Sequence, residues 1–224
     1  ANHQIEKLFF APAAITYGLE YHLNALDDKV IAYDIRTQQS TNIFGGYFQS
    51  EWTSKLFNVL IGARLDKHNL LENPVFVPRI NFLYKPTTNL QVRASYSSGY
   101  RAPQAYEEDF HVTQVGGFSL RTRLADNLKP EYPNSFALSA DYYCQIGDNW
   151  QGNILLEGFY TILNDVFAIR ELETDTLTQT LYQERYNASG ATIAGASITA
   201  KAAYKDIFTL SLGYTLQSSK YHQT

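Results

Sequence analysis

Apolar and polar residues alternate over most of this chain, and this pattern is the feature that most limits how it can fold. Residues 90–97 read LQVRASYS, and residues 208–216 read FTLSLGYTL. Successive side chains of a β-strand point to opposite faces, so a period of two predicts strands with one apolar face. No segment of helical length shows the helical spacing as cleanly. We therefore expect an all-β chain with antiparallel neighbours only. The expected strands number about nine and lie near residues 13–25, 42–53, 56–66, 78–86, 90–99, 134–146, 150–163, 186–204 and 207–219.

The connections between these strands alternate strictly between short and long. The short ones are expected at residues 54–55, 86–89, 147–149 and 205–206, and the long ones at residues 26–41, 67–77, 100–132 and 164–185. A soluble β-sandwich has no reason for this alternation, whereas outer-membrane barrels have short periplasmic turns and long extracellular loops. Several strands also exceed about ten residues, the length of a tilted bilayer crossing. The sequence therefore predicts an antiparallel meander that forms a partial transmembrane β-barrel.

The two faces of the predicted sheet differ as a membrane barrel requires. The outer face is apolar and includes Phe44, Phe48, Trp52, Phe57, Val59, Ile61 and Leu65. The inner face is too charged for a dry core and includes Gln49, Glu51, Arg64, Arg79, Asn81, Lys85, Arg93, Asp141 and Glu157. We expect lipid contact for Leu90, Val92, Phe136, Leu138, Phe208 and Leu210, and an aromatic girdle at Trp52 and Trp150 beside the short turns. A soluble antiparallel sheet with one wet face is the alternative, but it does not explain the alternating connections.

Composition argues against several other classes. With 18 Lys and Arg against 22 Asp and Glu, the chain has no basic excess for binding nucleic acid. Its one cysteine, Cys144, excludes an internal disulfide framework and a cysteine zinc site. The longest apolar runs, such as residues 9–15, are too short for a membrane-spanning helix. The chain contains no methionine, so Ala1 is expected to be a processed or trimmed start. An odd number of strands cannot close a bacterial barrel, so we expect a piece of a larger one.

Seven short motifs give the chain a resemblance to TonB-dependent outer-membrane receptors, because they follow one another in that family's order. They are GLE at residues 18–20, QSEW at 49–52, GARLD at 62–66, PRINFLYKP at 78–86, GYRAP at 99–103, LKPE at 128–131 and NASGA at 187–191 with Gly195. Each motif alone is unspecific, and the ordered set carries the resemblance over nearly the whole chain. One departure lies at Ala196 and Ser197, where many members have an acidic residue.

The resemblance implies a fold, a function and a set of partners. The fold is one segment, over residues 1–224, of a 22-stranded plugged barrel, without the plug, the TonB box or the C-terminal strands. The function is active transport across the outer membrane of a Gram-negative bacterium, with no catalysis and no resident cofactor. The partners are the plug of the same full-length chain, the TonB complex acting through it, outer-membrane lipid, and a bulky ligand such as a siderophore, haem, cobalamin or other metal complex. A surface lipoprotein is a further candidate partner.

The longest connection, at residues 100–129, is the predicted place of ligand contact, because long loops usually serve a function. It combines aromatic, acidic and basic residues that could stack on a bulky ligand and hydrogen-bond to it. The candidate ligand-binding residues are Tyr100, Arg101, Gln104, Tyr106, Glu107, Glu108, Asp109, His111, Arg121 and Arg123. The acidic stretch could instead capture a cation, or be solvated or paired with the arginines. The loop could also only shield the barrel mouth or meet a lipoprotein.

Other functions remain open from the sequence alone. No catalytic or nucleotide-binding motif occurs, and the five histidines are scattered without metal-ligand spacing. A passive porin, an outer-membrane enzyme and a soluble β-rich binding module are the rival classes. If the loop at residues 100–129 does not bind the ligand, the long connection at residues 164–185 becomes the next candidate.

Overall fold

The computed structural model confirms the predicted all-β class. It describes residues 1–31, 35–103, 114–115, 118–175, 180–205 and 207–222. These residues form fourteen strands in two sheets and contain no α-helix. None of the described residues belongs to a helix long and apolar enough to cross a membrane.

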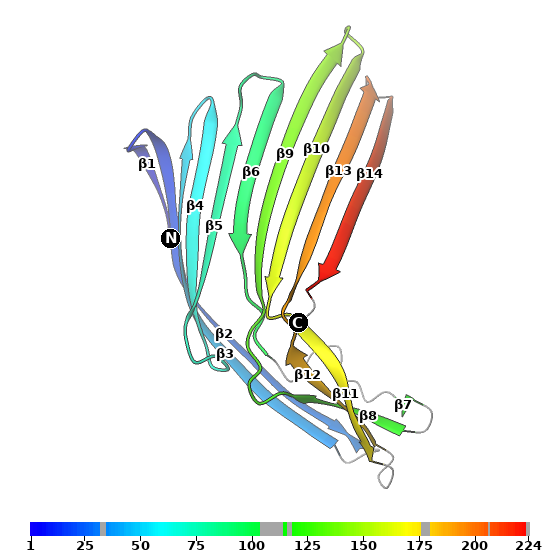
Figure 1. Cartoon of the computed structure of the whole chain (residues 1–224). Coiled ribbons are helices and arrows are strands. Elements are labelled where there is room, and N and C mark those ends of the chain that lie inside the picture. Colours follow the sequence, from blue (N-terminus) through cyan, green and yellow to red (C-terminus); the bar gives the residue numbers. More distant parts are fainter. Residues whose placement is uncertain (32–34, 104–113, 116–117, 176–179, 206, 223–224) are drawn as a thin grey trace.

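Ten strands form one curved sheet, which we call the wall (Figure 1). Its neighbouring strands are all antiparallel, as predicted, and follow chain order except where long loops intervene. In sheet order they are β1 (Asn2–Leu8), β2 (Ala11–Val30), β3 (Ile35–Thr53), β4 (Phe57–His68), β5 (Val75–Tyr84), β6 (Leu90–Ser98), β9 (Tyr132–Ile146), β10 (Trp150–Asn164), β13 (Gly190–Tyr204) and β14 (Phe208–Tyr221). Of these ten wall strands, β1 was not among the nine expected from the sequence, because its polar sequence NHQIEKL shows no alternation.

The short turns all lie at one end of the wall, at the top of Figure 1, and the long connections leave from the opposite end. The aromatic residues beside the short turns lie where they were predicted. Trp52 packs near Phe10, with ring centroids 6.0 Å apart, and Trp150 packs near Tyr204 at 5.0 Å. Both tryptophans therefore lie beside short turns, as predicted, and their place in an aromatic girdle stays a prediction.

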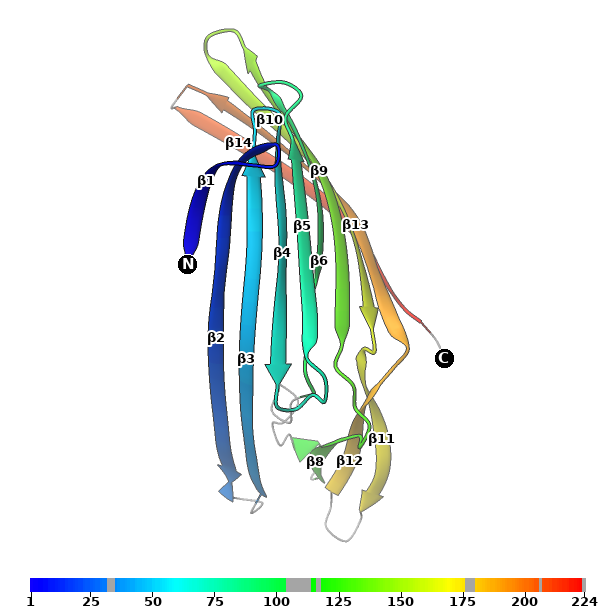
Figure 2. The same ribbon diagram turned by 90° about the vertical axis from the view of Figure 1, so that its left-hand side faces the viewer.

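The expected loop at residues 26–41 continues two strands of the wall. Residues 26–41 were expected to connect two strands, but β2 and β3 pair from Ala13↔Trp52 to Val30↔Ile35. Their hairpin projects beyond the other wall strands (Figure 2). The extension escaped prediction because it carries polar side chains on both faces, such as Asp27 and Gln38 on one and Asn24 and Gln39 on the other, which leaves no clear apolar alternation to detect.

A second sheet is built only from the two longest connections, and we call it the loop sheet. It contains β7 (Gln114–Val115), β8 (Phe118–Leu124), β11 (Phe167–Asp175) and β12 (Thr180–Asn187), in the order β11-β12-β8-β7. The pair β8–β12 is parallel, so the prediction of antiparallel neighbours only was wrong here. No tight turn joins β8 to β12, and a short hairpin is what forces an antiparallel pair.

The strand register keeps one apolar and one polar face across the wall. One row on the apolar face runs through Ile61, Ile80, Tyr96, Phe136 and Tyr160. The next row, on the polar face, runs through Gln49, Arg79, Ser97, Ser135 and Thr161. Large apolar residues on the first face remain exposed, for example Leu138 at 59% and Leu210 at 46%. No second layer of described residues covers them, and their contact with lipid stays a prediction.

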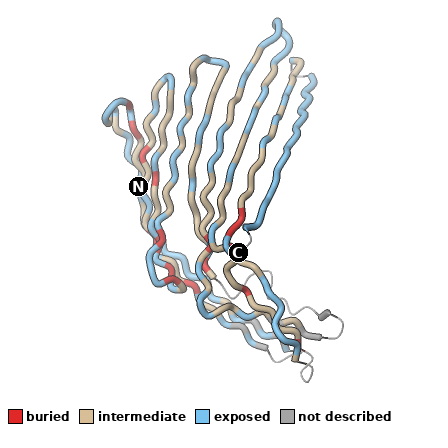
Figure 3. The backbone as a smooth tube through the Cα atoms, in the orientation of Figure 1, coloured by how far each residue is buried: buried red, intermediate tan, exposed pale blue. Residues whose placement is uncertain are grey.

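Buried residues are few, and they gather largely where the wall meets the long loops (Figure 3). A small apolar cluster there consists of Leu71, Val75 and Ala102, with Tyr100 and Tyr132 packed against it. His68 is the largest fully buried side chain described, and its Nδ1 accepts the amide of Leu70. The most buried part of the described chain therefore lies at the roots of the loops.

Candidate functional site

Only some of the predicted ligand-binding residues can be placed. Tyr100, Arg101 and Arg123 are described with their side chains, and Arg121 is described only as part of the strand β8. The remaining candidates lie outside the described residues: Gln104, Tyr106, Glu107, Glu108, Asp109 and His111.

Tyr100 is attached to the polar face of the wall. Its hydroxyl donates to Asp66 Oδ2 at 3.2 Å, and Asp66 also accepts Arg64 Nε at 2.7 Å. Arg64 reaches across to Glu20 at 2.5 Å. Burial, followed by the charge of Asp66, raises the pKa of Tyr100 to about 12. The phenol is therefore a neutral donor held at the loop root.

Gly45 makes this arrangement possible. It lies opposite Asp66 in the register of β3 and β4. A Cβ at Gly45 would collide with the Asp66 carboxylate and the Arg64 guanidinium. Gly45, a residue that is costly within a strand, thus allows a close approach of charged side chains.

Arg101 closes the root of the first long loop, the connection between β6 and β9. Its amide and carbonyl exchange two hydrogen bonds with Glu131, each 3.0 Å long, and its guanidinium lies 3.4 Å from the Glu131 carboxylate. The buried Glu131 also accepts the backbone amide of Phe167. The two motifs GYRAP and LKPE therefore meet in space, and Arg101 joins the points where the loop leaves and re-enters the wall.

Asn187 is a functional candidate that the sequence analysis did not single out. Its Oδ1 accepts the Lys129 amide at 2.7 Å, and its Nδ2 donates to the Lys129 carbonyl at 2.9 Å. The same Nδ2 donates to the Asp165 carbonyl at 2.7 Å. Its place in the NASGA motif was the available signal, but its partner 58 positions away could not be read from the sequence. A third motif thus joins the same junction.

Arg123 lies in a recess that both long loops form. Its guanidinium is 4.1 Å from the centre of the Tyr182 ring. The recess measures about 430 Å3 and is lined by Arg123, Leu172, Glu173, Thr174, Asp175 and Tyr182. It can offer a cation, an aromatic face and carboxylates to a ligand. Most of the lining residues belong to β11 and β12, and none of these was among the predicted ligand-binding residues.

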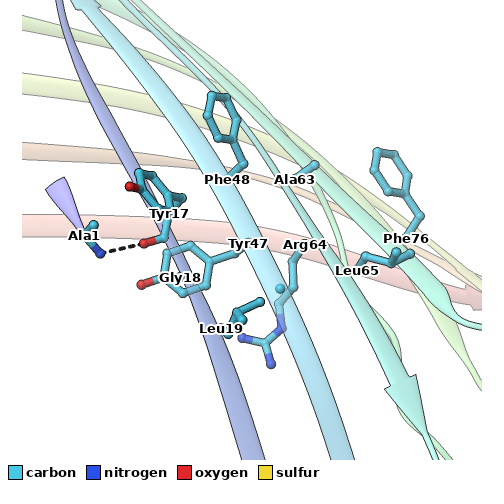
Figure 4. A pocket seen from close by; sticks show the side chains of 11 residues that line it. Ala1, Tyr17, Gly18, Leu19, Tyr47, Phe48, Ala63, Arg64, Leu65 and Phe76 are labelled. Atoms are coloured by element: carbon cyan, nitrogen blue, oxygen red, sulfur yellow. Dashed lines mark hydrogen bonds between the residues drawn. The ribbon is translucent and has the colours of Figure 1, made fainter. Parts of the chain in front are cut away.

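A larger recess lies on the wall itself and holds none of the predicted residues. It measures about 680 Å3 and surrounds Gly18, Gly46 and Ala63 (Figure 4). Its apolar side chains, including Leu19, Phe48, Leu65 and Phe76, belong to the outward face of the wall. We therefore assign it to the apolar surface rather than to the ligand site. Among the described residues, no group of His, Cys, Asp and Glu side chains could hold a metal ion.

Comparison with known proteins agrees with this geometry. Residues 4–224 match the family "TonB dependent receptor-like, beta-barrel". The iron-regulated outer membrane virulence protein of Vibrio cholerae is 30% identical over 105 residues, which cover 46% of this chain and 16% of that protein. The siderophore receptor PirA of Pseudomonas aeruginosa superposes with a TM-score of 0.73 at 18% identity, covering 97% of this chain and 41% of PirA. A ferric enterobactin receptor (PfeA) mutant from the same species gives 0.71 at 16% identity, covering 96% and 34%.

An open wall of antiparallel strands, apolar outside and polar inside, with short turns on one rim, defines an outer-membrane β-barrel protein. Within that class, the chain belongs to the family of TonB-dependent receptors. Its place is the outer membrane of a Gram-negative bacterium. The family and the structural neighbours are receptors and transporters, not enzymes. The chain spans less than half the length of the relatives it matches.

Proposed function

We propose that the chain forms part of the wall and the extracellular ligand region of a receptor that imports an iron complex. The observation that carries the proposal is the loop sheet, which brings the two longest connections together around one recess. The names of the relatives support iron as the cargo, since they include an iron-regulated protein, a siderophore receptor and a ferric enterobactin receptor. Haem, cobalamin and other metal complexes are the competing ligands.

The recess suggests distinct roles for the candidate residues. Arg123 would hydrogen-bond the oxygen atoms that surround a chelated metal, and Tyr182 would stack on a flat part of the ligand. Tyr100 and Arg101 would act indirectly, because their polar groups already hold the loop root. Ligand contact would then shift outward along the loop, from its first residues to β8.

The polar face of the wall would receive the plug of the full-length chain. Arg93 and Glu157 flank Ser139 in one row of this face, around a recess of about 360 Å3. Charged groups in such a place need counter-charges or water, which a plug surface provides. Import would be energised by the TonB complex acting on that plug, and a surface lipoprotein is a further partner to test.

The test uses the full-length receptor in outer-membrane vesicles. The probes are radioactive iron bound to enterobactin, to a hydroxamate siderophore, and to haem. Arg123→Ala is expected to weaken binding of the preferred probe by about tenfold, the loss of one charged contact. Arg170→Ala is the matched control, because Arg170 lies over Tyr186 on the same sheet but outside the recess.

Three outcomes would contradict the proposal. Failure of all three probes to bind would remove the iron complex as ligand. Equal binding by Arg123→Ala and wild type would remove the recess from the site. Uptake that continues in cells without TonB would favour a passive channel.

A further inference from the structure

The two long loops are joined by backbone pairing along most of β8. This strand comes from the connection between β6 and β9, and β12 comes from the connection between β10 and β13. They form six parallel register pairs, from Thr180↔Ser119 to Arg185↔Leu124. The amide of Ala125 extends the pairing by donating to the Arg185 carbonyl at 3.0 Å.

Within its own loop, β8 has much less support. Its only described partner there is β7, through two register pairs, Gln114↔Ser119 and Val115↔Phe118. A strand paired over two residues is not stable by itself in water. The ordered form of β8 therefore depends on β12, which belongs to the other loop.

The roots of the loops are joined as well as their strands. The Asn187 amide bonds both the N–H and the C=O of Lys129, as a paired strand residue would. The Glu131 carboxylate accepts the amide of Phe167. The guanidinium groups of Arg101 and Arg185 lie 5.4 and 5.7 Å from the Phe167 ring. The two long loops are thus joined both by the pairing of β8 with β12 and by side-chain contacts where the loops meet the wall.

We infer that the two loops form one mechanical unit, and that Asn187 is the positioning residue that transmits order from the second loop to the first. The candidate ligand residue Arg123 is then held in place by residues of the other loop. A ligand that binds the recess meets a preformed surface, and a ligand contact with either loop stabilises both loops. The ligand part of this inference rests on the proposed function, but the coupling does not.

The coupling is tested first without any ligand, by hydrogen exchange of the full-length receptor in detergent micelles. Asn187→Ala is expected to speed exchange by about tenfold in residues 118–131, the other loop, because the loss of the two bonds to Lys129 lowers the free energy of opening that segment. Asn187→Asp keeps the acceptor for the Lys129 amide but turns an acceptor oxygen toward the carbonyls of Lys129 and Asp165, so an effect at least as large is expected. Asn164→Ala, an exposed asparagine at the end of β10, is the control. Faster exchange confined to residues 165–190 would overturn the inference, because a purely local role predicts that pattern.

A cross-link tests whether the loops separate when ligand binds. Gln183 Nε2 donates to Thr122 Oγ1 at 2.6 Å across the β8–β12 pair, so Thr122→Cys with Gln183→Cys, in a Cys144→Ser background, should form a disulfide. The control cross-link replaces Ser135 and Thr161 in the wall, whose hydroxyls are 3.0 Å apart.

Ferric enterobactin is the probe, and reduced and oxidised proteins are compared. We expect the oxidised loop cross-link to keep affinity within about twofold, because a unit that is already joined loses nothing when it is tied. A loss of about tenfold with the wall cross-link unaffected, or failure of the loop cysteines to bond, would overturn the inference. If the reduced protein binds neither this probe nor ferric hydroxamate or haem, the proposed function fails while the exchange result still decides the coupling.

Discussion

Replacing Asp66 by alanine should destabilise the receptor more than its single position suggests. The carboxylate is almost fully buried and accepts hydrogen bonds from two residues on different segments. One is Arg64 in β4, and the other is Tyr100 at the root of the first long loop. The substitution therefore loosens a strand and a loop at once.

The magnitude follows from these contacts. Arg64 Nε lies 2.7 and 2.9 Å from the two carboxylate oxygens, and hydrogen bonds to charged groups contribute about 1.5–3 kcal/mol. The Arg64 side chain is 33% exposed and keeps Glu20 as a partner, so part of this loss is recovered by solvent screening. We expect Asp66→Ala to lower the free energy of unfolding by about 2–3 kcal/mol, and Tyr100→Phe by about 1 kcal/mol.

The assay is urea unfolding of the full-length receptor in phospholipid vesicles, followed by tryptophan fluorescence. The double variant should cost about 1 kcal/mol less than the sum of the single changes, because both remove the same hydrogen bond. A change below about 0.5 kcal/mol for Asp66→Ala, the usual range of surface substitutions, would refute the reasoning. So would strict additivity of the two variants.

The apolar face and the projecting hairpin allow two further predictions. Leu156, six residues beyond Trp150 in β10, lies deep along the wall, whereas Leu210 lies two residues from Phe208 beside the turn. Leu156→Arg should therefore cost about 2–4 kcal/mol and Leu210→Arg about 1 kcal/mol by vesicle unfolding, and equal costs would contradict the assigned depth. In the hairpin, hydrogen bonds from Arg36 lower the pKa of Asp27 from 3.8 to about 2. A lowered pKa means that this pair stabilises the folded hairpin above pH 3.8 and loses its effect as the pH falls toward 2. Arg36→Gln should bring the pKa of Asp27 back toward its ordinary value and so remove most of this pH dependence in hydrogen exchange of residues 24–31, and an unchanged profile would argue against the pair.

The strands of the wall were predictable because apolar and polar side chains alternate along them with a period of two. Residues 90–97 and 208–216 alternate apolar and polar side chains, so the sequence alone shows which face of each strand is apolar. The two tryptophans follow the same logic, since a residue beside a turn is fixed once the turn is recognised. β1 was missed because NHQIEKL has polar side chains on both faces.

The candidate site was less predictable because it depends on contacts between distant segments. The motifs at residues 99–103 and 128–131 were visible, but the ion pair of Arg101 with Glu131 emerges only when the wall brings both ends of the loop together. Tyr182 lies in the other long connection, and its stacking with Arg123 needs the parallel pair β8–β12. Pairings between different loops leave no periodic trace in either segment.

The parallel pair also sets an order of assembly. Ser119 and Thr180 are 61 positions apart, and between them the chain must build the hairpin of β9 and β10. Non-local strand pairs form slowly, because the intervening chain must first be organised. β8 therefore stays without its main partner until that hairpin has joined the wall and β12 has followed it. The loop sheet is therefore completed only after this hairpin has joined the wall in the correct register.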